Sequence, residues 1–75
     1  MNPGDLLCIR KLCHSYPKNW VRGQDPYKHP HDTIAVFLSE SIEDPQSPYP
    51  RIFYDVITPG GHHTINSSFC SKIDQ

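Results

Sequence analysis

Short apolar segments separated by turn residues run along the chain and predict strands rather than helices. The first covers residues 5–12, the second covers residues 33–39 and the third covers residues 51–58. Each segment is rich in β-branched or aromatic residues and is bounded by Pro, Gly, Asn, Asp or Ser, which is typical of strands. Alternation in the second segment puts Ile34, Val36 and Leu38 on one face, and we expect that face to point into the core.

The last third of the chain predicts a hairpin followed by one helical turn. Pro59-Gly60-Gly61 is the clearest turn signal, because glycine adopts the positive φ angles that a tight turn needs. A fourth strand is expected over residues 62–66, a single helical turn over Ser67-Ser68-Phe69, and a last strand over residues 70–73. Five strands on 75 residues bury their apolar faces only by closing into a small barrel, so we expect one all-β domain over residues 1–75. Its expected core combines Leu7, Ile9, Ile34, Val36, Leu38, Ile52, Tyr54, Val56, Ile65 and Phe69.

Two polar segments without sustained periodicity are predicted to be loops. Residues 13–32 contain three prolines, and a structureless segment of this length in so small a domain is often functional. Residues 40–50 are acidic and contain three more prolines, which predicts a second, rigid loop.

The order of these elements resembles that of small SH3-like barrels. The resemblance covers nearly the whole chain and rests on Pro3-Gly4-Asp5-x-Leu7-x-Ile9, the strands around Ile34–Leu38 and Ile52–Tyr54, and the Gly60-Gly61 turn before Ile65 and Ser67-Ser68-Phe69. The chain is particularly similar to short SH3-like proteins of bacteriophages, most of them of undefined function. The resemblance implies a five-stranded SH3-like barrel with a long first loop and one helical turn before the last strand. It also implies a phage accessory or virion-associated role.

The chain departs from two branches of that family. Thr33 stands where KOW-type members have a glycine, and the chain is not basic. The acidic and aromatic cluster of SH3 domains that bind proline peptides is missing at recognisable spacing, so the peptide-binding residues of those domains are not transferred to this chain.

Charged residues are unevenly distributed along the chain, although the net charge is small. Residues 1–31 hold five basic and two acidic side chains and the remainder holds two basic and six acidic ones, for a net charge of −1.

No stretch approaches the roughly 18 apolar residues of a membrane span, and the N-terminal residues lack the pattern of a secretion signal. Three cysteines, an odd number, argue against a disulfide framework. We therefore expect a protein of the cytoplasm, or of the host cytoplasm or virion if a phage encodes it.

Catalytic and cofactor motifs are not recognisable, and we expect a protein that is not an enzyme and has no cofactor. A nucleophile needs a base at hydrogen-bond distance and a third group that orients the base, which the sequence neighbours Cys13 and His14 do not provide. Gly60-Gly61 lacks the helix and lysine of a phosphate loop.

A small zinc protein remains an alternative, because cysteine and histidine are frequent. They are Cys8, Cys13, His14, His29, His31, His62, His63 and Cys70. Their spacing contains no zinc knuckle. A looser site from His29, His31, His62 and His63 requires residues 13–32 to fold over the Gly60-Gly61 hairpin.

Residues 13–32 interleave aromatic and basic side chains and are the expected contact surface. The candidate contact residues are Tyr16, Lys18, Trp20, Arg22, Tyr27 and Lys28. Aromatic and arginine side chains anchor protein interfaces, and proline-stiffened loops lose less entropy on docking, so we expect a non-enzymatic module that binds a protein partner. A nucleic-acid-binding regulator that stacks bases on the same aromatics is the first alternative, although an isoelectric point near 6.5 weakens it. In a further alternative, Trp20 and Val21 fold back and cap an open end of the barrel.

Overall fold

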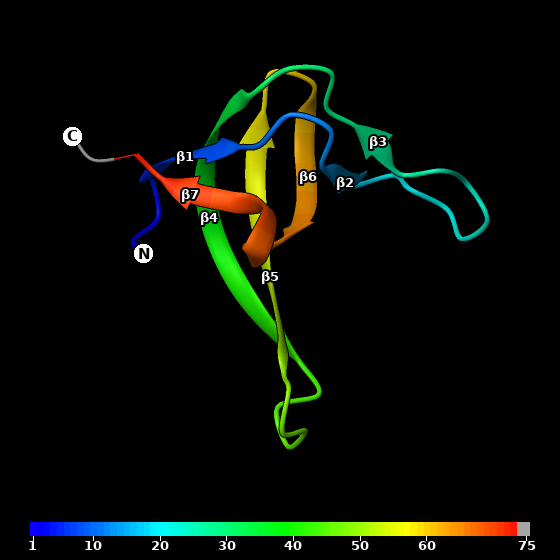
Figure 1. The fold of residues 1–75 in the computed structure, drawn as a ribbon, viewed down its shortest axis with the longest axis vertical. Coiled ribbons are helices and arrows are strands. Elements are labelled where there is room, and N and C mark those ends of the chain that lie inside the picture. Colours follow the sequence, from blue (N-terminus) through cyan, green and yellow to red (C-terminus); the bar gives the residue numbers. More distant parts are fainter. Residues whose placement is uncertain (74–75) are drawn as a thin grey trace.

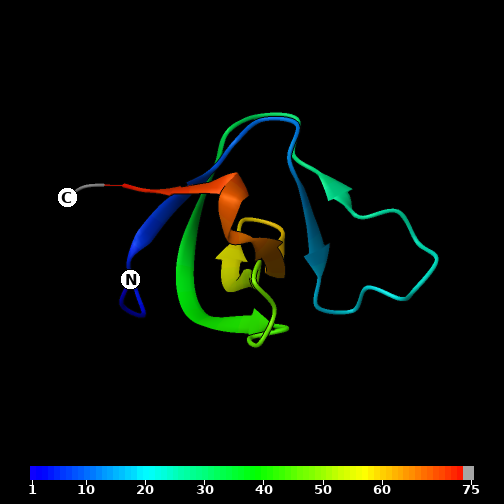
Figure 2. The same cartoon turned by 60° about the horizontal axis from the view of Figure 1, so that its bottom comes forward.

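Seven antiparallel strands and one 3₁₀ turn make up the computed structural model, which describes residues 1–73. The strands are β1 (Leu6–Ile9), β2 (His14–Pro17), β3 (Tyr27–Lys28), β4 (Thr33–Glu43), β5 (Arg51–Thr58), β6 (Gly61–Asn66) and β7 (Cys70–Lys72), and the turn η1 (Ser67–Phe69) precedes β7. They form one sheet in the order β3-β2-β6-β5-β4-β1-β7. The sheet curls into a half-barrel with β3 and β7 at its two ends (Figures 1 and 2). Within residues 1–73, no helix is long and apolar enough to cross a membrane.

The all-β prediction is confirmed, but the predicted count of five strands and the closed barrel are wrong. The two additional strands, β2 and β3, lie inside the segment that was expected to be a loop. They form because β2 completes the edge of β6, with Tyr16 opposite Thr64 and Pro17 opposite His63, and β3 then pairs with β2. Only one β2 side chain is buried, so the hydrophobic pattern gave no signal for this strand.

The remaining elements lie close to their predicted positions. β5 and η1 have the predicted bounds, and β4 continues to Glu43, so that it takes up the beginning of the expected acidic loop. The β4–β5 hairpin therefore extends beyond the curled part of the sheet as a two-stranded ribbon (Figure 1).

The core lies on the concave face of the curl and uses the opposite face of β4 from the predicted one. The buried apolar residues are Leu7, Ile9, Ala35, Phe37, Val56 and Ile65, with Cys13, Tyr54, Phe69 and Cys70 packed against them. The prediction was wrong for Ile34 and Leu38, which are 52% and 36% exposed, and Val36 is only half-buried. Ala35 pairs with Leu7 of β1, and paired residues of neighbouring strands point to the same side of a sheet. The β1 register thus turns Ala35 and Phe37 inward.

Gly61 confirms the prediction that the β5–β6 turn needs a positive φ angle. Its φ is 114°, and an added Cβ would meet no atom within 4 Å, so a side chain there is opposed by backbone strain alone. Gly60 has no such φ, and its added Cβ would make ordinary contacts with Thr58 Oγ1 at 3.7 Å and His63 Nε2 at 3.8 Å.

Gly61→Ala is therefore expected to lower the free energy of unfolding by about 1–3 kcal/mol. Gly60→Ala is expected to change it by less than about 0.5 kcal/mol. Urea unfolding of the two variants measures the difference. Equal losses at both positions would contradict the assignment of the strain to Gly61.

Candidate functional site

Two strand edges bring a buried polar cluster together beside the apolar core. β2 lies between β3 and β6, and Ser15 is the one β2 side chain that points inward. His63 of β6 shares the inward face with Ile65, and His29 directly follows β3. Ser15, His29 and His63 are 0%, 2% and 4% exposed.

Hydrogen bonds join these side chains into one continuous chain. Ser15 Oγ lies 2.6 Å from His63 Nδ1 and 2.8 Å from His29 Nε2. His29 Nδ1 lies 3.1 Å from Thr33 Oγ1, and Thr33 Oγ1 donates to the carbonyl oxygen of His31 at 3.1 Å.

The hydrogen bond from Thr33 Oγ1 to the carbonyl of His31 fixes the direction of the other hydrogen bonds in this chain. Because the Thr33 hydroxyl donates to a carbonyl, it accepts from His29, so Nδ1 of neutral His29 carries the proton and Nε2 accepts. Ser15 then donates to His29 Nε2 and accepts from His63 Nδ1. Neutral His63 therefore has its proton on Nδ1 and a free lone pair on Nε2.

Burial favours the neutral form of both rings. Removal from water lowers the pKa of His29, and the nearby His63 and His14 lower it further. Removal from water likewise lowers the pKa of His63, with a smaller contribution from His62. The neutral forms are the ones that the directed hydrogen-bond chain requires.

A cavity of about 300 Å³ opens against this cluster. The Tyr27 ring meets the His29 ring edge-on at a centroid distance of 4.9 Å and the His63 ring at 5.7 Å. The cavity thus lies between the base of the segment 13–32 and the β5–β6 turn. Its lining residues are Pro17, Tyr27, His29, Thr33, Thr58, Pro59, Gly60 and His63.

Ser15 and His29 resemble the hydroxyl–imidazole pair of a nucleophilic site in distance but not in access. The Ser15 hydroxyl is fully buried, and its oxygen already accepts from His63. A substrate carbonyl has no path to it, whereas the lone pair of His63 Nε2 faces the cavity. The arrangement presents a fixed hydrogen-bond acceptor to a small ligand.

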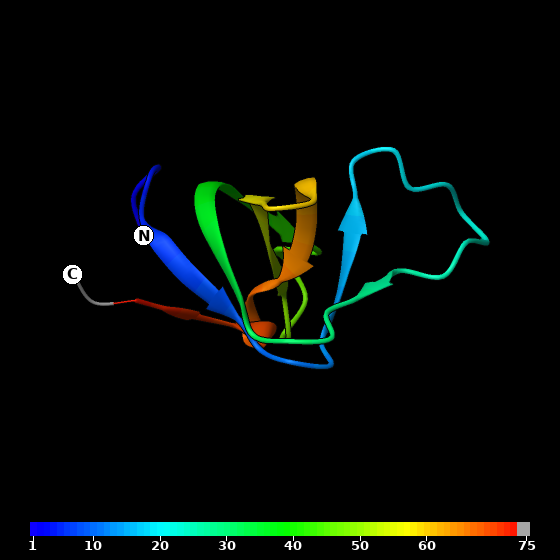
Figure 3. The same ribbon diagram turned by 90° about the horizontal axis from the view of Figure 1, so that it is seen from above.

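Lys18, Trp20 and Arg22 lie on the connection between β2 and β3, which projects from the half-barrel (Figure 3), whereas Tyr16 lies in β2 and Tyr27 and Lys28 lie in β3. We call residues 13–32 the arm. Tyr16 and Tyr27 are 37% and 48% exposed, the three basic residues are exposed, and Trp20 is half-buried. Trp20 packs edge-on against Tyr16 with a centroid distance of 4.9 Å, and Val21 is 61% exposed, so the capping alternative is wrong.

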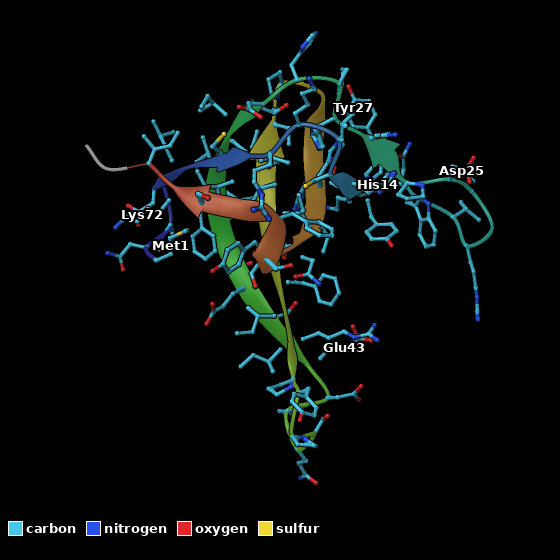
Figure 4. The ribbon with its side chains drawn as sticks, viewed as in Figure 1. Met1, His14, Asp25, Tyr27, Glu43 and Lys72 are labelled. Atoms are coloured by element: carbon cyan, nitrogen blue, oxygen red, sulfur yellow. The ribbon has the colours of Figure 1, made fainter. Side chains whose placement is uncertain are left out.

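Of the six candidate contact residues, only Tyr27 lines the cavity. Figure 4 shows Tyr27 and His14 on the side where the arm leaves the half-barrel, away from Met1 and Lys72. Ser15 was not predicted as a site residue. His29 and His63 were expected only as part of a looser metal site, although the position of His63 on the same inward face as Ile65 was a usable signal.

Only two of the four histidines of the expected metal site lie close together. His29 and His63 do meet, with ring centroids 6.1 Å apart, but His31 is exposed and His62 Nε2 lies 3.7 Å from Asp55 Oδ1. Among residues 1–73, no group of three or more His, Cys, Asp and Glu side chains is placed to hold a metal ion. Cys8, Cys13 and Cys70 are free thiols, and burial raises the pKa of Cys70 to about 11.

Comparison of the chain with protein families, with curated proteins and with solved structures finds no match to any of them.

Proposed function

We propose that the protein is a non-enzymatic interaction module that binds a protein partner through the arm. The observation that carries the proposal is the exposure of apolar and aromatic side chains on a projecting segment, Val21 at 61% and Tyr27 at 48%. Such side chains gain most from burial against a partner, and aromatic residues are frequent among interface hot spots.

Hydrogen bonds within the arm support this role because they hold its tip in one shape. Trp20 N donates to the carbonyl of Pro17 at 2.8 Å, and Gln24 N donates to the carbonyl of Val21 at 3.0 Å. Trp20 Nε1 donates to the carbonyl of Gln24 at 3.0 Å. A segment that is already ordered loses less conformational entropy on binding.

The basic side chains of the arm favour a second candidate, nucleic-acid binding. Lys18, Arg22 and Lys28 are exposed, and Asp25 is the acidic residue between them. Binding of a single strand would weaken steeply with salt, because phosphate contacts release counterions. Protein binding anchored by Trp20 and Tyr27 would depend little on salt.

The likeness to SH3-like phage barrels adds to the proposal an accessory or virion-associated role. This part of the proposal rests on the sequence resemblance, and the curled antiparallel sheet with its single turn η1 before the last strand is compatible with the fold that the resemblance implies.

Site-specific photocrosslinking tests the contact surface. A benzoylphenylalanine at Val21 is expected to crosslink one partner, and the same residue at Tyr49, which is 86% exposed on the β4–β5 hairpin, is expected to crosslink none. Excess unlabelled protein should suppress the Val21 product. Excess Trp20→Ala protein should suppress it at least about fivefold less effectively, which corresponds to a loss of about 1 kcal/mol. Equal suppression by both proteins, or equal crosslinking from both positions, would contradict the proposal.

A further inference from the structure

We propose that the cavity beside His63 receives a tryptophan side chain of the partner protein and that the indole N–H binds His63 Nε2. The inference rests on the proposed function, since the arm that contacts the partner also forms one wall of the cavity. It adds the identity of the group that is recognised.

The His63 side chain has an open hydrogen-bond acceptor beside the cavity. His63 Nε2 has no hydrogen-bond partner among residues 1–73, although His63 as a residue is only 4% exposed. Every fully buried side-chain nitrogen or oxygen of the described residues has a hydrogen-bond partner. Because Nε2 has none, this atom is not fully buried, and we infer that it is reached from the cavity that His63 lines. Gly60 lies beside this atom, since a Cβ there would make van der Waals contact with Nε2 at 3.8 Å.

The hydrogen-bond chain makes this acceptor a selective one. Ser15 accepts the proton of His63 Nδ1 and in turn donates to His29, whose other nitrogen is fixed by Thr33. The His63 ring therefore presents a lone pair, and only a donor complements it. An acceptor placed there would leave two buried lone pairs facing each other, which disfavours its binding.

The lining excludes a charged occupant. It contains no lysine, arginine, aspartate or glutamate, and burial lowers the pKa of its two histidines, which favours their neutral forms. A charged group in this cavity would lose its hydration without gaining an opposite charge.

The size and walls of the cavity favour one flat ring system. About 300 Å³ is at the lower end of the range of small-ligand sites. Pro17 and Pro59 offer flat apolar walls, and the Tyr27 ring offers an aromatic one. Indole combines a large flat apolar surface with a single N–H donor, so it satisfies the acceptor and leaves no polar atom of its own unpaired.

The test is a titration of the full chain with N-acetyl-tryptophanamide and with its 1-methylindole analogue, followed by amide NMR shifts at pH 7.5. The parent compound is expected to shift the amides of Tyr27, Gly60 and His63. The analogue, which lacks the donor, is expected to bind about tenfold more weakly. Equal affinity of the two compounds, or no shift at these amides, would overturn the assignment.

Two variants test the role of the hydrogen-bond chain. Gly60→Ala puts a methyl group beside Nε2 without backbone strain and should weaken binding of the parent compound about tenfold while the fold is kept. Ser15→Ala should move the His63 proton from Nδ1 toward Nε2, which imidazole ¹⁵N shifts report directly, and should weaken binding as well. An unchanged tautomer in Ser15→Ala would refute the positioning role of Ser15, and unchanged affinity in Gly60→Ala would refute the site.

Further experiments separate this inference from the proposed function and from nucleic-acid binding. Adenosine that shifts the same amides at lower concentration than the tryptophan compound would overturn the choice of occupant. If Gly60→Ala competes for the Val21 crosslink as well as the unaltered protein does, the pocket assignment fails and the arm contact stands. If Trp20→Ala also competes equally, the arm contact itself fails.

Discussion

Phe37→Ala is expected to lower the free energy of unfolding by about 3–5 kcal/mol, whereas Ile34→Ala should cost no more than about 1 kcal/mol. Phe37 is 3% exposed and meets the Tyr54 ring edge-on at a centroid distance of 5.1 Å, so its removal leaves a cavity in the core. Ile34 lies three residues earlier on the same strand and is 52% exposed. The pair tests which face of β4 is buried, because alternation of the apolar residues alone predicts the reverse order.

Urea unfolding followed by circular dichroism measures both losses. A loss of this size is a large part of the stability of a small domain, so Phe37→Ala is expected to be partly unfolded without denaturant. Phe37→Leu serves as the graded variant: it keeps most of the buried volume and should cost less than Phe37→Ala but more than Ile34→Ala. A larger loss in Ile34→Ala than in Phe37→Leu would show that the convex face of β4 is the buried one.

The sequence alone does not show which face of β4 is buried, because both faces are apolar. Ile34, Val36 and Leu38 alternate with Ala35 and Phe37, and a period of two says which residues share a face but not which face is inside. The longer apolar set was the natural choice. The register with β1, which places Ala35 opposite Leu7, decides against it, and register is a property of two strands together.

Elements with strong local signals were predictable. β5 has the expected bounds, η1 forms at Ser67–Phe69, and Gly61 has the positive φ expected of the turn. These features depend on neighbouring residues and on intrinsic backbone preferences. The arm strands lack such signals: β3 has two residues, and β2 buries one serine.

The candidate site combines a predictable half with an unpredictable one. His63 lies on the inward face of a strand that was expected, so a histidine beside the core was within reach of the sequence. Its partners Ser15 and His29 come from the segment that appeared to be a loop. Only the pairing of β2 with both β3 and β6 brings the three side chains together.

The buried histidines make the stability of the protein depend on pH in the range where histidine titrates. Burial lowers the pKa of His29 and of His63 in the folded state, and the adjacent His14 and His62 add repulsion in the same direction. The unfolded chain, with ordinary histidine pKa values of about 6.5, therefore binds more protons than the folded protein as the pH falls. Protonation would also give both nitrogens of His29 a proton, so Ser15 would lose the acceptor to which it donates.

The free energy of unfolding is therefore expected to be constant between about pH 7.5 and 8 and to fall as the pH decreases through about 6.5. At more alkaline pH it falls again, because burial raises the pKa of Cys70 and the unfolded chain loses this proton first. The slope has an upper limit of about 1.4 kcal/mol per pH unit for each of the two histidines. Urea unfolding at pH 7.5, 6.5 and 5.5 measures the slope above the range in which ordinary carboxylates titrate. His31→Gln is the matched control, because His31 is exposed and uses only its carbonyl in the hydrogen-bond chain, so the slope should persist in this variant. A free energy of unfolding that is unchanged between pH 7.5 and 5.5 would show that His29 and His63 accept protons inside the fold, and the directed hydrogen-bond chain would then have to be abandoned.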